Sequence, residues 1–144
     1  MSNTTYSVKK KEIVRKWYII DAENKPIGRV SAEAAKLLKG KHKPIYSTHL
    51  DTGDHVIIIN ASKAILTGKK MTQKIYRRHT GYIGNMKEVM AKDLMATKPE
   101  RAFMLAVKGM LPKNSLGRKM LTNLRVYAGT EHNHEAQKPV ELKF

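Results

Sequence analysis

Asp51-Thr52-Gly53 is the tripeptide with which aspartic proteases hold a catalytic carboxylate. Those enzymes need two such loops, because two carboxyl groups must share one proton. This chain has one, and Asp54 directly after it would add an unwanted negative charge. Asp and Gly are also typical of turns, where the Asp side chain accepts hydrogen bonds from loop amides. We therefore predict that this stretch is a structural turn leading into a strand at residue 56.

Gly68-Lys69-Lys70 resembles the end of a nucleotide-binding P-loop. That motif requires a glycine five positions before its Gly-Lys pair and a Ser or Thr directly after it. Lys63 and Lys70 occupy those two positions, so the motif fails at both ends. We predict instead that Lys69 and Lys70 bind phosphate groups of a larger polyanion.

His132-Asn133-His134, flanked by Glu131 and Glu135, is the one stretch that suggests a metal site or nuclease chemistry. Two histidines two positions apart can bind zinc, but a closed site needs further ligands. The other four histidines are scattered along the chain. The interpretation we favour is that these histidines, in their neutral form, stack on or hydrogen-bond to RNA, without metal or nuclease chemistry.

The stretch Tyr76-Arg77-Arg78-His79-Thr80-Gly81-Tyr82 interleaves aromatic, cationic and hydroxyl groups. Arg guanidinium groups bind phosphates bidentately, and Tyr or His rings stack on unpaired bases. An ordinary solvated basic loop is the alternative. The pattern favours contact with nucleic acid.

The composition of the chain restricts the classes of partner that it can bind. The 144 residues include 28 Lys and Arg against 12 Asp and Glu, a formal net charge of +16, and no cysteine. Such a charge repels itself unless a polyanion neutralises it. The longest apolar run, Ala102–Val107, is far shorter than the roughly 20 residues of a membrane-spanning helix, and no secretory signal is expected. The absence of cysteine excludes disulfides and thiolate metal sites and is typical of an intracellular protein.

The basic residues are also unevenly distributed. All twelve acidic residues lie outside the windows 34–50, 55–87 and 101–130, which together contain 17 of the 28 basic residues. An ordinary surface mixes the two signs. Long basic stretches without acids are typical of phosphate neutralisation, so we expect a nucleic-acid partner.

The predicted elements that position these residues begin with a β-α-β unit. An apolar run at 17–20 ends at Asp21 and predicts a first strand. Apolar residues from Val30 to Leu38 recur at helical spacing, with Gly40 just past the last of them, which predicts an amphipathic helix over 29–39. The run at 56–59 is apolar without alternation, which predicts a strand covered on both faces, as in a parallel sheet.

Further elements are expected along the rest of the chain. We predict a short helix over 63–66 capped by Ser62, an extended stretch at 74–79 and a helix around 87–96. A capping box of Thr97 and Glu100 predicts a buried helix over 99–108, ended by Gly109 and Pro112. A short helix at 115–122 and a strand at 124–127 follow. Trp17, Phe103 and Met104 are expected in the core.

The fold class that follows is α/β, with helices on both faces of a small, mostly parallel sheet. We expect residues 1–15 to form a basic N-terminal tail that orders late or on its partner. Residues 16–144 are expected to form a single domain.

Several long blocks resemble, in the same order, the bacterial form of the large-subunit ribosomal protein L-thirteen family. They span roughly residues 16–139 and end with a block from Glu131 to Pro139. The others are Trp17-Tyr-Ile-Ile-Asp21-Ala22, Leu38-Lys-Gly-Lys-His42-Lys43, His49-Leu-Asp51-Thr-Gly-Asp54, Ile59-Asn60-Ala61, Thr67-Gly-Lys-Lys70, His79-Thr-Gly81, Ala106-Val-Lys-Gly-Met-Leu-Pro-Lys113, Leu116-Gly-Arg118 and Val126-Tyr-Ala-Gly129. The chain departs from the family at Ile83-Gly84-Asn85, usually Pro-Gly-Gly, and at Asn114, usually Gly. We expect Asn114 to adopt the left-handed conformation that a glycine would.

The resemblance implies a three-layer α/β/α fold with a small, mostly parallel four-stranded sheet and no enzymatic activity. It implies binding to large-subunit ribosomal RNA beside neighbouring large-subunit ribosomal proteins in the cytoplasmic ribosome, and a part in early subunit assembly. No cofactor, metal, membrane or small-molecule substrate is expected. Combined with the basic windows, it predicts RNA contacts at Arg29, Lys39, Lys41, His42, Lys43, Lys69, Lys70, Arg77, Arg78, His79, Lys113, Arg118, Lys119, His132 and His134.

Two alternatives stay open at this point. One is an RNA-processing enzyme that uses His132 and His134. The other is a regulator that binds its own messenger RNA, as a second role that would use the same charges.

Overall fold

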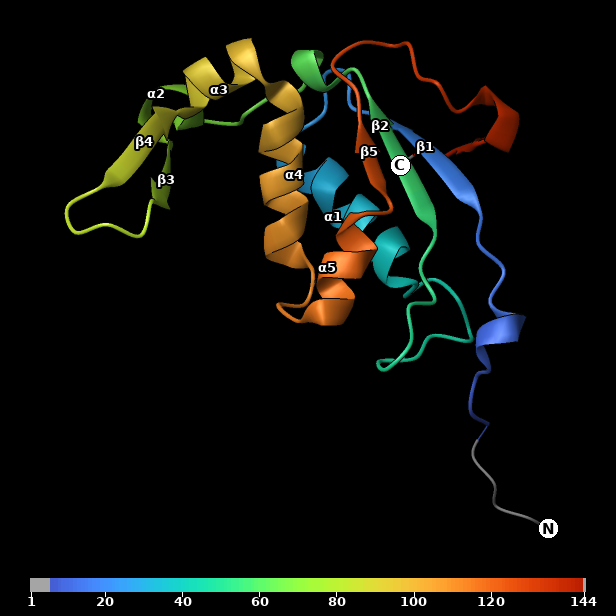
Figure 1. Ribbon diagram of the computed structural model, residues 1–144. Helices are drawn as coiled ribbons and strands as arrows, with labels where there is room; N and C mark the ends of the chain where they lie inside the picture. The colour runs from blue at the N-terminus through green and yellow to red at the C-terminus, as the bar shows by residue number, and fades with distance from the viewer. Residues whose placement is uncertain (1–5, 144) are drawn as a thin grey trace.

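The computed structural model describes residues 6–143 and is built around one parallel sheet (Figure 1). Its strands are β1 (Trp17–Asp21), β2 (His55–Ile59), β5 (Leu124–Val126) and β6 (Val140–Glu141), in the order β5-β2-β1-β6. All three neighbouring pairs are parallel, with Ile57 of β2 between Ile19 of β1 and Arg125 of β5. The α/β class and the parallel four-stranded sheet are thus confirmed.

Strand β2 lies in the middle of the molecule because its side chains are apolar on both faces. Val56, Ile57 and Ile58 are fully buried, as predicted from the apolar run. Parallel strands normally have both faces covered, because the crossover segments that connect them pack on the faces of the sheet.

Three helices, α1 (Ile27–Lys39), α4 (Pro99–Met110) and α5 (Ser115–Leu121), pack together on one face of the sheet (Figure 1). Helix α1 begins two residues before its predicted start, where Ile27 donates its backbone N–H to Ile65. It ends at Gly40, whose φ of 77° confirms the predicted glycine stop. Phe103 and Val107 of α4 are fully buried against this layer.

The opposite face is covered by residues 127–139 of the C-terminal segment, which contain the short 3₁₀ helix η3 (Glu135–Gln137) and lead into β6 (Figure 1). Trp17 is half-buried there rather than fully enclosed. Its ring stacks on His55 at 4.3 Å between centroids and lies 5.1 Å from the ring of His134. The chain therefore forms three layers, of which this outer one is the thinnest.

The ends of α4 differ from the prediction. Thr97 does not cap α4 but closes the preceding helix α3 (Ala91–Thr97), where its hydroxyl donates to Asp93 at 2.7 Å. Pro99 is the first residue of α4 instead. Proline is favoured there because the backbone N–H at the start of a helix has no partner within the helix, so its absence costs nothing. Gly109 lies inside the helix and does not end it.

A hairpin replaces the first part of the helix predicted around 87–96. Strand β3 (Ile75–His79), within the stretch predicted to be extended, pairs antiparallel with β4 (Met86–Met90). Gly81 and Gly84, with φ of 102° and 76°, form the connection. The short helix α2 (Lys70–Gln73) precedes the hairpin, which extends beyond α4 (Figure 1).

Two smaller predictions were also wrong. The chain forms the 3₁₀ helix η2 (Ala61–Lys63) rather than a helix over 63–66, because Asn60 is left-handed and the backbone extends again at Ala64. Asn114 is extended, with a φ of −129°, and is not left-handed. Its side chain caps α5 by accepting the Gly117 N–H at 2.7 Å, a role that Gly could not perform.

The N-terminal tail lies partly outside the described residues, namely at 1–5. Its described part contains the 3₁₀ helix η1 (Lys10–Glu12) and is tied to the body through Val14 and Arg15. Between residues 6 and 143, no helix combines the length and the apolar character needed to span a membrane.

Candidate nucleic-acid interface

A hollow of about 720 Å³ separates the β3–β4 hairpin from α4, and we call it the hairpin groove. Many of the residues that line it are basic, and none is Asp or Glu. Apolar side chains such as those of Val89 and Leu105 also line it. The basic lining residues are Lys74, Arg77, Arg78, Lys87, Arg101 and Lys108. An acid-free cationic groove of this size can bind the phosphates of a nucleic-acid strand.

The hairpin register brings like charges together. Arg78 lies directly opposite Lys87, and such pairs destabilise a sheet unless something neutralises them. One strand position away, Arg77 forms an ion pair with Glu88 at 2.7 Å, so its charge is partly compensated. Lys74 lies over the ring of Tyr76, 5.0 Å from its centroid. Arg78 and Lys87 are therefore the hairpin cations best placed for an external anion.

Helix α4 supplies the other wall of the groove. Arg101, Leu105 and Lys108 are spaced four and three residues apart, which places them along one face of the helix. The opposite face of α4 buries Phe103 and Val107. Because α4 is packed into the core, it fixes the positions of the Arg101 and Lys108 backbone relative to the groove.

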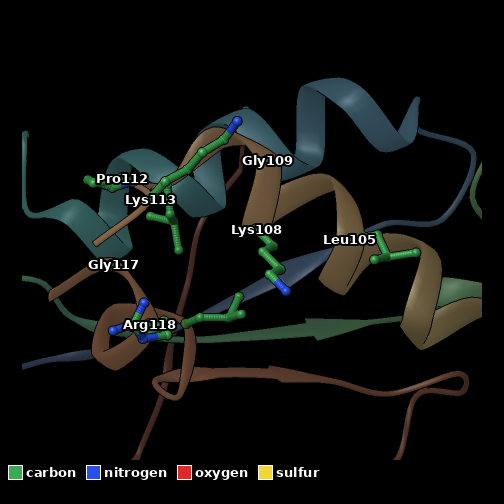
Figure 2. A pocket seen from close by; sticks show the side chains of 9 residues that line it. Leu105, Lys108, Gly109, Pro112, Lys113, Gly117 and Arg118 are labelled. Carbon is green, nitrogen blue, oxygen red and sulfur yellow. The ribbon is translucent and has the colours of Figure 1, made fainter. Parts of the chain in front are cut away.

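A second hollow, of about 500 Å³, lies between α4 and α5, and we call it the α4–α5 hollow (Figure 2). Lys108, Lys113 and Arg118 line it together with several apolar residues. It shares Leu105 and Lys108 with the hairpin groove, so the two hollows adjoin along α4. Lys119 is exposed next to Arg118 on α5.

The end of α1 adds a third basic area. Lys36, Lys39 and Lys41 line a hollow of about 290 Å³ together with Met110 at the end of α4. The predicted residues Lys39 and Lys41 therefore lie near the C-terminal end of α4. Helices α1, α4 and α5 and the hairpin all lie on the same side of the sheet (Figure 1), and each contributes basic residues to one of the three hollows.

His42 and Lys43 are engaged within the protein. The carboxylate of Asp54 is fully buried, and it lies 2.6 Å from the Lys43 ammonium and 2.8 Å from His42 Nε2. Lys43 also donates to the carbonyl oxygens of Val14 and Thr52, at 2.8 and 3.0 Å. An ammonium has three donors, so none of them is left for RNA. RNA contact by these two residues stays a prediction, and the geometry favours a structural role.

The Asp51-Thr52-Gly53 turn is also structural. Asp51 is buried and accepts from the Arg15 guanidinium at 2.9 Å. Gly53 packs so closely on the end of α1 that a Cβ there would lie 1.7 Å from the Leu38 carbonyl oxygen. The turn therefore clamps the N-terminal chain and α1 together, in agreement with the structural interpretation.

Four further predicted residues are exposed. Arg29 lies on the first turn of α1, and Lys69 immediately precedes α2. Lys70 donates to the Thr67 hydroxyl at 3.2 Å. At the end of β3, the His79 ring accepts the Gly81 N–H at 3.0 Å and thereby orders the hairpin turn. Their contact with RNA stays a prediction.

His132 and His134 belong to the C-terminal segment, which lies on the other side of the sheet from α1, α4 and α5 (Figure 1). The His134 ring is within hydrogen-bonding distance of the Tyr127 hydroxyl, at 3.0 Å, and packs near Trp17. His132 accepts the His134 backbone N–H at 3.3 Å. No three His, Asp or Glu side chains within 6–143 cluster closely enough to hold a metal ion.

The structure thus brings only some of the predicted RNA-binding residues close together. Arg77, Arg78, Lys113 and Arg118 line adjoining hollows, whereas the two C-terminal histidines do not join them. Sequence reasoning did not select the further lining residues Lys74, Lys87, Arg101 and Lys108. All four fall inside the acid-free windows, which was the one signal that could have found them.

Comparison with known proteins gives matches to a family of ribosomal proteins. The sequence model of one family, described as "Ribosomal protein L13", matches residues 15–133. Relatives called large ribosomal subunit protein uL13 are similar over nearly the whole chain. That of Ruminiclostridium cellulolyticum is 59% identical, covering 96% of both chains. That of Natranaerobius thermophilus is 60% identical, covering 94% of this chain and 95% of the relative, and that of Carboxydothermus hydrogenoformans is 60% identical, covering 98% and 99%.

Proposed function

The chain belongs to the ribosomal protein L13 family, and from that premise we propose that it is a non-enzymatic constituent of the large ribosomal subunit that binds ribosomal RNA through the hairpin groove and the α4–α5 hollow. Its partners are large-subunit ribosomal RNA and the adjacent large-subunit proteins. The proposal includes a part in early subunit assembly. Binding to its own messenger RNA stays a prediction from the sequence.

The observation that carries the proposal is the acid-free lining of the hairpin groove. Phosphates would stabilise the groove cations that have no acidic partner, and the Arg78–Lys87 pair would lose its cross-strand repulsion. The groove walls are a hairpin and a helix rather than long loops, so the charges are held in place before RNA arrives. The protein acts as a fixed scaffold on which RNA strands converge.

The experiment is a competition for incorporation into large subunits. A variant with Arg78→Glu and Arg101→Glu is co-expressed with the wild type, and the ratio of the two in purified subunits is measured by mass spectrometry. We expect the variant to be under-represented by about tenfold or more, because lost charge-assisted hydrogen bonds are worth roughly 1.5–3 kcal/mol each. Its melting temperature should stay close to that of the wild type, since both side chains are exposed.

The matched control carries Lys138→Glu and Lys143→Glu. It makes the same change in net charge on the C-terminal segment, away from the groove. This control should be incorporated like the wild type. Equal incorporation of the groove variant would show that the groove is not the RNA interface.

A further inference from the structure

Nothing in the described residues, 6–143, requires glycine at position 109. Gly109 lies inside α4 with an ordinary helical backbone, and a Cβ added there would meet no atom within 4 Å. Glycine in a helix costs about 0.5–1 kcal/mol relative to alanine. By contrast, a Cβ at Gly117 would lie 1.8 Å from the Pro112 carbonyl oxygen, so glycine is required there by packing. The space beside Gly109 is therefore open to a group from outside the chain.

That space is the α4–α5 hollow, which Gly109 lines (Figure 2). Its apolar walls are formed by Leu105, Leu111, Pro112 and Leu121. A volume of about 500 Å³ falls within the range of roughly 300–1,000 Å³ that is typical of small-ligand pockets. The bare backbone at Gly109 lets a flat group approach the helix closely.

The cations that line the hollow indicate that its ligand carries negative charge. Lys108 comes from α4, Lys113 from the loop after it and Arg118 from α5, and no acidic residue lines the hollow (Figure 2). An apolar side chain of another protein would fill the walls but leave three positive charges without a partner. A nucleotide matches both parts, because its base is flat and its phosphate is anionic.

We infer that the α4–α5 hollow receives one unpaired base of the RNA, packed against the Gly109 backbone, with the flanking phosphates held by Lys113 and Arg118. This inference rests on the proposed function and specifies one contact within it. The hairpin groove, which shares Leu105 and Lys108 with the hollow, receives the continuing strand. The hollow thus sets the register in which the strand lies along α4.

The test fills the hollow by Gly109→Leu, with Gly109→Ala as the matched control. Both remove the helix glycine, but only leucine occupies the hollow. Large-subunit ribosomal RNA bound to each purified protein is probed with dimethyl sulfate and a 2′-hydroxyl acylating reagent. We expect one or two unpaired nucleotides to change reactivity with the wild type and with the alanine variant. With the leucine variant, those nucleotides should react as in free RNA, and affinity should fall about 5- to 100-fold.

The outcomes separate the two proposals. If the wild type protects no ribosomal RNA, the proposed function is wrong. If the leucine variant binds RNA with the same affinity and the same protections as the alanine variant, only the inference about the hollow is wrong.

A second measurement does not depend on the leucine variant folding. The chain has no cysteine, so Gly109→Cys carries a unique thiol for a photo-crosslinker. Irradiation of assembled large subunits should give crosslinks confined to one or two adjacent nucleotides. Crosslinks to a ribosomal protein, or crosslinks dispersed along the RNA, would overturn the inference. Lys138→Cys on the C-terminal segment provides the control.

Discussion

The ammonium of Lys43 lies 2.6 Å from the fully buried carboxylate of Asp54. The Lys43 side chain is itself only 13% exposed. Asp54 also accepts the Lys16 N–H at 2.8 Å, so the pair joins the N-terminal chain to the loop after α1. A buried carboxylate is tolerated only while its partners are present.

Replacing Lys43 with methionine should therefore destabilise the fold. We expect Lys43→Met to lower the free energy of unfolding by about 3 kcal/mol or more, because the charge of Asp54 would stay buried with fewer partners. Urea unfolding at pH 7 measures this change. Lys41→Met, two positions earlier and exposed, should change it by less than about 0.5 kcal/mol. Equal effects of the two substitutions would contradict the structural role of Lys43.

The three glycines Gly53, Gly117 and Gly109 should respond to alanine in opposite directions. A Cβ at Gly53 or Gly117 would lie within 1.8 Å of a backbone carbonyl oxygen, so each substitution should cost about 3 kcal/mol or more. Gly109→Ala meets open space and should stabilise the protein by about 0.5–1 kcal/mol. Thermal unfolding of the three variants tests this ranking, and a destabilised Gly109→Ala would show that glycine has a packing role there.

His55 should make stability depend on pH. Burial lowers the pKa of His55 below its ordinary value, and the nearby charges of Arg15 and Arg125 lower it further, against the weaker opposing effect of Asp54 and Asp51. The unfolded chain then binds the proton more readily than the folded one. Stability is consequently full above the ordinary histidine pKa and decreases as pH falls through that value toward the folded pKa.

The comparison that isolates this effect uses His55→Phe, which keeps a ring against Trp17. Between pH 7.5 and pH 5, the wild type should lose more stability than this variant. Urea unfolding at several pH values measures the difference. Parallel pH profiles would show that another group causes the loss.

RNA binding should weaken steeply with salt. If the six groove cations each neutralise one phosphate, the slope of log affinity against log salt should be roughly −4 to −5. Filter binding between 50 and 300 mM KCl on a ribosomal RNA fragment provides the measurement. Arg78→Gln with Arg101→Gln should reduce the slope by roughly 1.5–2. A slope near zero would place the interface elsewhere.

The sequence by itself determined the local parts of this fold. The spacing of apolar residues from Val30 to Leu38 predicted the buried face of α1, and Gly40 predicted its end, because both signals act within a few residues. The apolar run of β2 similarly predicted its burial on both faces. The acid-free windows contained every cation of the hairpin groove, since net charge needs no geometry.

Only the tertiary structure decided which charged side chains are exposed to solvent and which are bound within the protein. Lys41 and Lys43 look alike in the sequence, yet one is exposed and the other is bound to Asp54, eleven residues further along. Residues 86–90 form a strand because β3 pairs with them, against the helix that their own pattern suggested. In each case the deciding energy comes from contacts between distant segments, which local sequence patterns do not contain.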